Sequence, residues 1–181
     1  MVMKIRWMAV LICGLVAASA FAQDNRTVGL QVGAFLPTSS AAQDLFGKQW
    51  LSVSLTPRPY DLKPGLSYSE NLNVLGRDNN GNKVFMLLPT YGARFVMGDI
   101  NAKGMTPYVA ARVGPAYFDY SLTYQGVRHS TKRVGFTGHI EVGAWFNKSF
   151  RVYGQYNKMS EFDGVRFDGF EVGVAFALFK F

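Results

Sequence analysis

The sequence predicts an all-β protein, an eight-stranded antiparallel up-and-down transmembrane β-barrel. Three observations support this prediction. The 181 residues are 15% aromatic and include 19 glycines, a composition typical of many closely packed strands. Apolar and polar residues alternate with a period of two after residue 22, and no segment sustains a helical period. Turn sequences separate the alternating segments into an even number of strands in successive hairpins.

The first 22 residues are predicted to be a signal peptide, which leaves residues 23–181 as one barrel domain. Lys4 and Arg6 precede an apolar stretch that is too short for a membrane helix, and Ala20-Phe21-Ala22 resembles a cleavage site. Removing these residues takes away two of the 19 basic residues and the single cysteine. The remaining domain has no disulfide, so its core and its strand pairing must hold it together.

The first two expected strands flank a polar loop. Residues 27–36 place valine, leucine and alanine on one face, and glycine, glutamine and Phe35 on the other. The loop that follows is expected to contain a short helical turn at residues 41–46. Residues 50–56 alternate leucine and valine with serine and threonine, and two prolines end this strand because proline lacks an N–H group.

The third and fourth expected strands, residues 66–75 and 84–97, form a hairpin. The loop between them, residues 77–82, is rich in residues that accept a left-handed backbone. Pro89 interrupts the alternation of the fourth strand. We therefore expect a β-bulge at this proline.

The second half of the chain supplies four more strands, at residues 107–124, 133–146, 150–159 and 168–181. The last strand has phenylalanine, valine and leucine on one face and mostly glycine and alanine on the other. Its facing stays open, because a lipid-facing Phe181 would place Glu171 on the lipid side too. Connections after strands 1, 3, 5 and 7 are expected outside the cell.

A soluble periplasmic barrel is the alternative, because the same alternation also fits an apolar interior. Three features favour the membrane. The bulky face carries aromatic residues near strand ends, as a lipid belt does, while the other face is small and polar. The isolated charged or titratable residues within strands share this second face: Arg94, Arg112, His139, Glu141 and Arg151.

The chain resembles the small outer-membrane β-barrel proteins of diderm bacteria, the opacity-protein, OmpA-barrel, OmpW and OmpX-like group. The signal peptide, the PYVAARVGPAYFDY stretch and the GFEVGVAFALFKF end carry the resemblance. It implies an outer-membrane location, a monomer, and contact with outer-membrane lipid, lipopolysaccharide and the barrel-assembly machinery. It implies architecture more than activity. Nucleic acid is not an expected partner, since the chain is exported and its cations are scattered.

The interior charges of such a narrow barrel must pair with one another. A turn centred on Gly126-Val127 would place Arg112 directly opposite Glu141. A three-residue turn at residues 147–149 would place Glu141 opposite Gln155. The predicted lumen network, interpreted as structural with a gate or proton path as the alternative, contains Arg112, Glu141, His139, Gln155 and Asn157.

Three functions remain open: a structural or surface-interaction barrel, a narrow OmpW-like channel for small hydrophobic solutes, and a lipid A-modifying enzyme. We expect no enzyme, because the adjacent His129 and Ser130 point to opposite faces of a strand. No cofactor or metal site is expected. Candidate lipopolysaccharide contacts are the loop cations Lys48, Arg77, Lys83, Arg128, Lys132 and Arg133.

Overall fold

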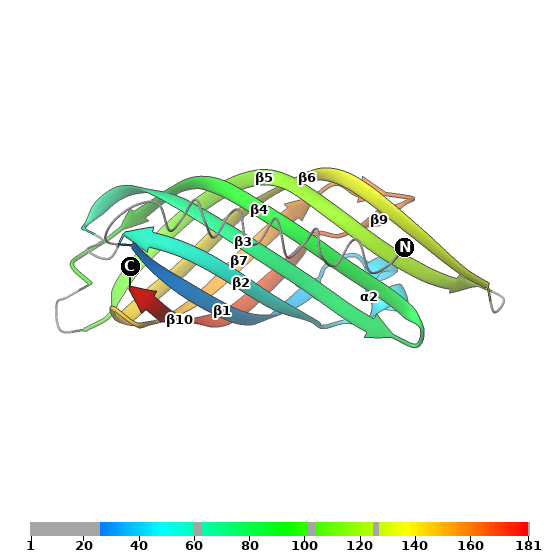
Figure 1. The fold of residues 1–181 in the computed structure, drawn as a ribbon, viewed down its shortest axis with the longest axis horizontal. Helices are drawn as coiled ribbons and strands as arrows, with labels where there is room; N and C mark the ends of the chain where they lie inside the picture. Colours follow the sequence, from blue (N-terminus) through cyan, green and yellow to red (C-terminus); the bar gives the residue numbers. More distant parts are fainter. Residues whose placement is uncertain (1–25, 60–62, 101–103, 125–126, 181) are drawn as a thin grey trace.

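The computed structural model, which describes residues 26–59, 63–100, 104–124 and 127–180, is a closed antiparallel barrel (Figure 1). The strand order is β1-β10-β7-β6-β5-β4-β3-β2, and β1 closes the barrel by pairing with both β10 and β2. The barrel strands are β1 (Arg26–Pro37), β2 (Trp50–Pro59), β3 (Gly65–Asn79), β4 (Asn82–Val96), β5 (Thr106–Tyr124), β6 (Val127–Asn147), β7 (Phe150–Met159) and β10 (Gly169–Lys180).

The predicted eight-stranded barrel is confirmed. The helix α2 (Ser40–Phe46) lies in the loop where a helical turn was expected. A small hairpin of β8 (Glu161–Phe162) and β9 (Val165–Arg166) follows β7. The strand β6 begins six residues before the expected position 133, because the polar residues at its start pair with β5.

The two ends of the barrel differ, as Figure 1 shows. We call the end with α2, the β8–β9 hairpin and the turns of the β3–β4 and β5–β6 hairpins the α2 end. We call the opposite end, where β1 starts and β10 finishes, the terminal end. The β5–β6 hairpin projects furthest beyond the α2 end of the barrel.

The facing of β10, which the sequence left open, is now defined. Phe170 and Val172 are each 54% exposed on the outer surface, while Glu171 between them is fully buried in the lumen. The pairing of β1 with β10 shifts between Val28 and Gly29, so the register changes near the end of β10. Phe181 lies outside the described residues.

The predicted bulge at Pro89 is wrong. Pro89 pairs with Leu72 in a continuous β3–β4 register, and the β4–β5 pairing has the same register on both sides of the proline. The backbone of β5 comes close here, because a Cβ added at Gly114 would lie 2.0 Å from the Pro89 carbonyl oxygen. A gap in the β4–β5 pairing therefore accommodates the proline without an extra residue.

The expectation of a small and polar lumen holds only for its middle part, because buried clusters that contain aromatic side chains lie toward both ends. At the α2 end, the aromatic side chains of Phe46, Trp50, Phe118 and Phe167 fill the interior, each at most 1% exposed. Their rings touch at tilted or edge-on angles, as between Phe46 and Trp50 with centroids 6.0 Å apart. Alternation in the sequence predicts whether a side chain points into the barrel or outward, but it does not predict how much space the lumen offers there.

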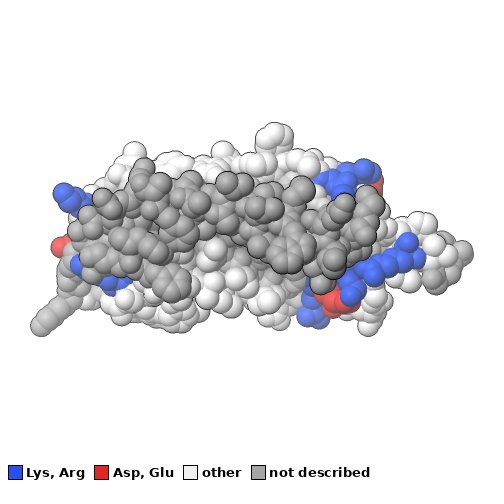
Figure 2. Space-filling view, in the orientation of Figure 1, with Lys and Arg blue, Asp and Glu red and all other residues white. Residues whose placement is uncertain are grey.

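The outer surface of the barrel is apolar. Among its most exposed large residues are Leu66, Phe136 and Val134, at 77%, 76% and 73%. On the visible part of the face in Figure 2, charged residues lie near the two ends and leave an uncharged zone between them. Such a zone fits the hydrocarbon layer of a bilayer. Among the described residues, no helix is long and apolar enough to cross a membrane.

Candidate functional site

The lumen holds a buried ionic cluster around Glu141 of β6, which is 0% exposed. Its carboxylate forms an ion pair with Arg112 of β5 and accepts a hydrogen bond of 3.2 Å from Nη1 of Arg151 of β7. The hydroxyl of Tyr108 donates to the same carboxylate at 2.6 Å. Two cations and one hydroxyl offset the cost of burying this carboxylate, and they tie three strands together.

The predicted register between β5 and β6 is wrong, because the turn lies one residue earlier in the chain than predicted. Tyr124 pairs with Val127, so the residues between the strands are 125 and 126 instead of Gly126-Val127. Arg112 therefore stands opposite His139, and its Nε donates to His139 Nε2 at 2.7 Å. The long arginine side chain still reaches Glu141 diagonally across the strand pair.

The register between β6 and β7 is the expected one, with Glu141 opposite Gln155 and His139 opposite Asn157. These pairs do not produce the single network that was predicted. Gln155 Nε2 instead donates to Glu171 at 2.8 Å and to Asn157 Oδ1 at 3.3 Å. The five predicted residues are all buried in the lumen but belong to two clusters.

The second cluster surrounds Glu171 of β10, which is not one of the five predicted network residues. Its carboxylate accepts four hydrogen bonds from neutral groups. The donors are Ser52 at 2.6 Å, Tyr153 at 2.7 Å, Gln155 at 2.8 Å and Asn73 at 3.0 Å. The bulky outer face of β10 was the signal that would have placed Glu171 inside.

A third buried group, Arg94 of β4, has fewer partners. Its Nη2 donates to Ser69 Oγ at 3.1 Å, and the same hydroxyl oxygen accepts from Arg112 Nη1 at 2.7 Å. Its guanidinium lies 5.8 Å from the ring centre of Tyr108 and 5.5 Å from that of Trp145. Its Nε and Nη1 atoms are buried without a hydrogen-bond partner.

These lumen groups do not form an arrangement for nucleophilic catalysis. Nε2 of His139 accepts a hydrogen bond from an arginine. His129 and Ser130 are consecutive residues of the regular strand β6, opposite Leu122 and Ser121 of β5. Within the described residues, no three His, Cys, Asp or Glu side chains are grouped so that they could hold a metal ion.

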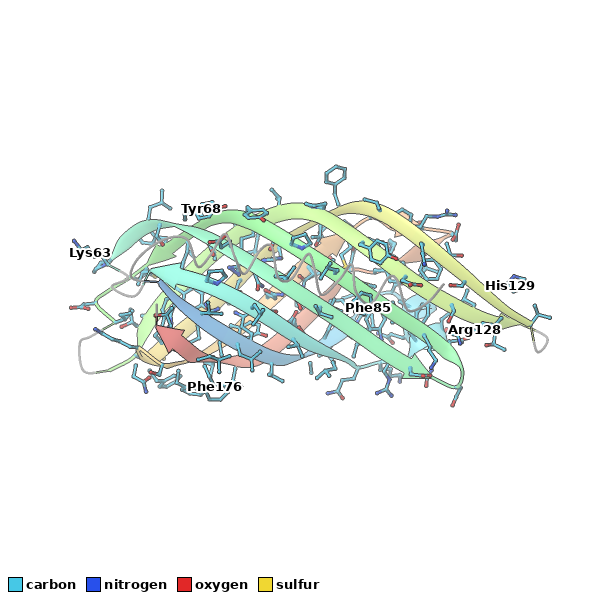
Figure 3. The ribbon with its side chains drawn as sticks, in the orientation of Figure 1. Lys63, Tyr68, Phe85, Arg128, His129 and Phe176 are labelled. Atoms are coloured by element: carbon cyan, nitrogen blue, oxygen red, sulfur yellow. The ribbon has the colours of Figure 1, made fainter. Side chains whose placement is uncertain are left out.

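The six predicted lipopolysaccharide contacts do not form one cluster. Lys83 pairs with Asp78 at 2.5 Å, Arg133 lies 3.6 Å from Asp163 of the β8–β9 hairpin, and Arg128 donates to Ser121 at 2.7 Å. Arg77 lies beside Gly47, which follows α2. Lys48 and Lys132 are exposed. Figure 3 shows Arg128 near the projecting turn of the β5–β6 hairpin, far from Lys63 at the terminal end.

A closed barrel with an apolar exterior and a buried polar lumen defines a membrane-spanning β-barrel protein. The chain belongs to the outer membrane protein beta-barrel domain family, whose sequence profile matches residues 8–177. It is therefore an outer-membrane β-barrel. No curated protein matches the sequence significantly.

Three solved structures have a similar fold. The N-terminal β-barrel domain of Pseudomonas aeruginosa OprF is 11% identical, with a TM-score of 0.57 over 86% of this chain and 98% of that one. Ail, the attachment invasion locus protein of Yersinia pestis, is 11% identical, with a TM-score of 0.57 over 86% and 100%. Neisserial surface protein A is 14% identical, with a TM-score of 0.52 over 86% and 98%. These identities indicate a shared fold only.

Proposed function

We propose that this protein is a non-enzymatic surface-interaction barrel that binds an extended segment of another protein along the free edge of β6. The observation that carries the proposal is the pairing of β6. It pairs with β5 from Val127 onward, but with β7 only from Thr137. Among the described strands, none pairs with the other edge of residues 127–132. Open edges of this kind accept an additional strand.

The two edges of the projecting hairpin differ. On the β5 edge, the side chain of Asn82 accepts a hydrogen bond of 2.8 Å from the backbone N–H of Thr123. On the β6 edge, the β8–β9 region covers only the part near the barrel, where Ser160 Oγ accepts from the Phe136 N–H at 2.9 Å. The β6 edge at residues 127–132, nearer the hairpin turn, is therefore the edge that a partner can pair with.

The charge of this segment favours an acidic partner strand. Residues 127–136 contain Arg128, Lys132 and Arg133 and no Asp or Glu. Like charges would oppose edge-to-edge pairing with a second copy, which is how proteins protect exposed edges. An extended segment that carries Asp or Glu would gain both backbone hydrogen bonds and charge complementarity.

Hydrogen exchange tests the edge and its occupant separately. The refolded barrel is mixed with a peptide that alternates threonine and glutamate, and a threonine–lysine peptide is the control. We expect fast exchange in part of residues 127–132 without peptide, and slower exchange with the acidic peptide only. Slow exchange throughout these residues in the free protein would refute the open edge. Fast exchange that the acidic peptide leaves unchanged would refute the partner.

The proposal requires the α2 end to face the outside of the cell. Connections after the odd-numbered barrel strands, which all lie at this end, are external in barrels that have short periplasmic turns. We also propose that the signal peptide is removed after Ala22, which leaves a chain without cysteine. A membrane-impermeant maleimide should then label Ser130→Cys on intact cells but not Ser149→Cys at the terminal end. The reverse pattern would overturn the orientation.

Lipid contacts follow from the same orientation. Arg128 and Lys132 have the same strand parity as the exposed Val134 and Phe136, so they face outward beyond the apolar zone. We propose that they contact lipopolysaccharide phosphates, whereas Arg133 pairs with Asp163. The barrel-assembly machinery remains a proposed partner for insertion. Replacing both outward cations by glutamine should weaken lipopolysaccharide binding to the refolded barrel more than Arg133→Gln does.

The two alternative functions have less support. A channel for hydrophobic solutes needs an open lumen, but fully buried aromatic residues fill the lumen at the α2 end. A lipid A-modifying enzyme needs a serine beside a histidine, and His139 lies beside Arg112 instead. Planar-bilayer recordings without defined conductance steps, and unchanged lipid A in cells that express the protein, are the expected results.

A further inference from the structure

The Glu141 cluster carries more positive than negative charge. Three guanidinium groups, those of Arg94, Arg112 and Arg151, lie around the single carboxylate of Glu141. The other buried carboxylate, Glu171, already accepts four hydrogen bonds from neutral donors. Uncompensated charge is costly at membrane depth, so a third arginine here needs a reason.

Arg94 is the arginine without an acidic partner among the described contacts. Among the described residues, its one hydrogen-bond acceptor is Ser69 Oγ, a neutral oxygen that also accepts from Arg112. Two cations thus converge on one hydroxyl, while Nε and Nη1 of Arg94 remain without an acceptor. A buried guanidinium that lacks acceptors is a strong donor site for an anion.

We propose that a small monovalent anion of halide size binds in the lumen beside Arg94 and Ser69. It would accept hydrogen bonds from the two free nitrogens of Arg94 and offset the excess charge of the three arginines. Water would supply acceptors but no charge. Polyatomic anions fit less well, because the rings of Tyr108 and Trp145 pack against the arginines and are at most 2% exposed.

Other groups toward the terminal end also favour an anion. The Oγ1 of Thr27, the Oγ of Ser54 and the Nε2 of Gln31 are buried donors without a partner. A surface hollow at this end is lined by Lys148, Arg151 and Trp145, and no described carboxylate is among its lining residues. The ring of Trp145 lies 5.5 Å from both the Arg94 and the Arg151 guanidinium groups. The hollow and the proposed site therefore share Trp145 as a neighbour, and the positive charges at the hollow attract anions to this end of the barrel.

Halide-dependent stability tests this proposal on the refolded full barrel. Unfolding in urea is measured in sodium bromide and in sodium gluconate of equal ionic strength, since gluconate is too large for the site. We expect bromide to raise the unfolding midpoint in a saturable way. Arg94→Met should weaken the apparent bromide affinity by about tenfold or more, the loss expected for a charge-assisted hydrogen bond. Arg133→Met, at the rim, should leave it unchanged.

Two results would overturn the proposal: equal midpoints in bromide and gluconate for the wild-type protein, or unchanged bromide dependence in Arg94→Met. If Arg94→Met does not fold, anomalous diffraction from bromide-soaked wild-type crystals decides the question. A bromide peak within hydrogen-bonding distance of Arg94 supports the site. A lumen without such a peak refutes it.

Discussion

Replacing Glu141 by glutamine should destabilise the barrel strongly. Glu141 is fully buried and has two arginine partners and a tyrosine partner. Glutamine removes the negative charge that the arginines pair with. Its amide NH2 group would also face guanidinium groups, which cannot accept a hydrogen bond. Leaving buried charges unpaired in this way costs about 3–5 kcal/mol of unfolding free energy.

The matched control is Glu171→Gln, which makes the same carboxylate-to-amide replacement at an equally buried residue. Its partners are neutral, and the hydroxyls of Ser52 and Tyr153 can reverse their hydrogen bonds to accept from the new amide. We therefore expect a smaller loss of about 1–3 kcal/mol. The charge of the partners makes the difference, since an arginine cannot become an acceptor.

The assay is reversible urea unfolding of the refolded barrel in lipid vesicles, followed by tryptophan fluorescence. Trp50 and Trp145 lie inside the barrel at its two ends, so their emission should respond to loss of the core. The double variant Glu141→Gln with Arg112→Met should recover part of the loss, because it removes one unpaired cation. A cost for Glu171→Gln that equals or exceeds that for Glu141→Gln would refute this account of the lumen.

Three further predictions concern backbone contact, the aromatic core and pH. Gly114→Ala should lower folding yield, because its Cβ would lie 2.0 Å from the Pro89 carbonyl oxygen, whereas Gly154→Ala, with its nearest contact at 3.8 Å, should fold normally in a gel-shift assay. Phe46→Ala should cost about 3–5 kcal/mol in urea unfolding, because it empties the fully buried site that the last residue of α2 occupies. The hydroxyl of Tyr120 donates to Asp163 and lowers the pKa of that carboxyl below its usual 3.8, so this contact stabilises the hairpin above that pH and is lost as the pH falls through the lowered value. An NMR titration should show the low midpoint, and Tyr120→Phe should raise it; an unchanged midpoint would contradict the assignment.

The sequence predicted the barrel because a strand that separates lipid from a lumen must alternate, and alternation is visible without a structure. It also placed Arg112, His139 and Glu141 on one inner face. It could not give the β5–β6 register, because a shift of one residue in the turn moves every pair, and the turn sequence permitted both positions. The predicted ion pair between Arg112 and Glu141 forms despite that error, because the long arginine side chain reaches Glu141 diagonally.

The aromatic cluster inside the α2 end was missed for a different reason. Phe118 of β5 points inward, as Arg112 does six residues earlier. Inside the barrel it packs against residues of the α2 end that are distant in the sequence. Whether an inward position holds a glycine or a phenylalanine depends on what packs across the barrel. The contacts of Phe46 and Phe167 with this cluster come from α2 and from the segment before β10, which no strand periodicity describes.

Quenching of tryptophan fluorescence by brominated lipid tests the inside–outside assignment most directly. The refolded residues 23–181 contain two tryptophans, Trp50 and Trp145, both at most 2% exposed inside the barrel. In vesicles with bromine on the acyl chains, we expect weak quenching of the wild-type protein and strong added quenching for Ile140→Trp on the outer face. Strong quenching of the native tryptophans, with an unquenched Trp at position 140, would show that the barrel has been assigned inside-out.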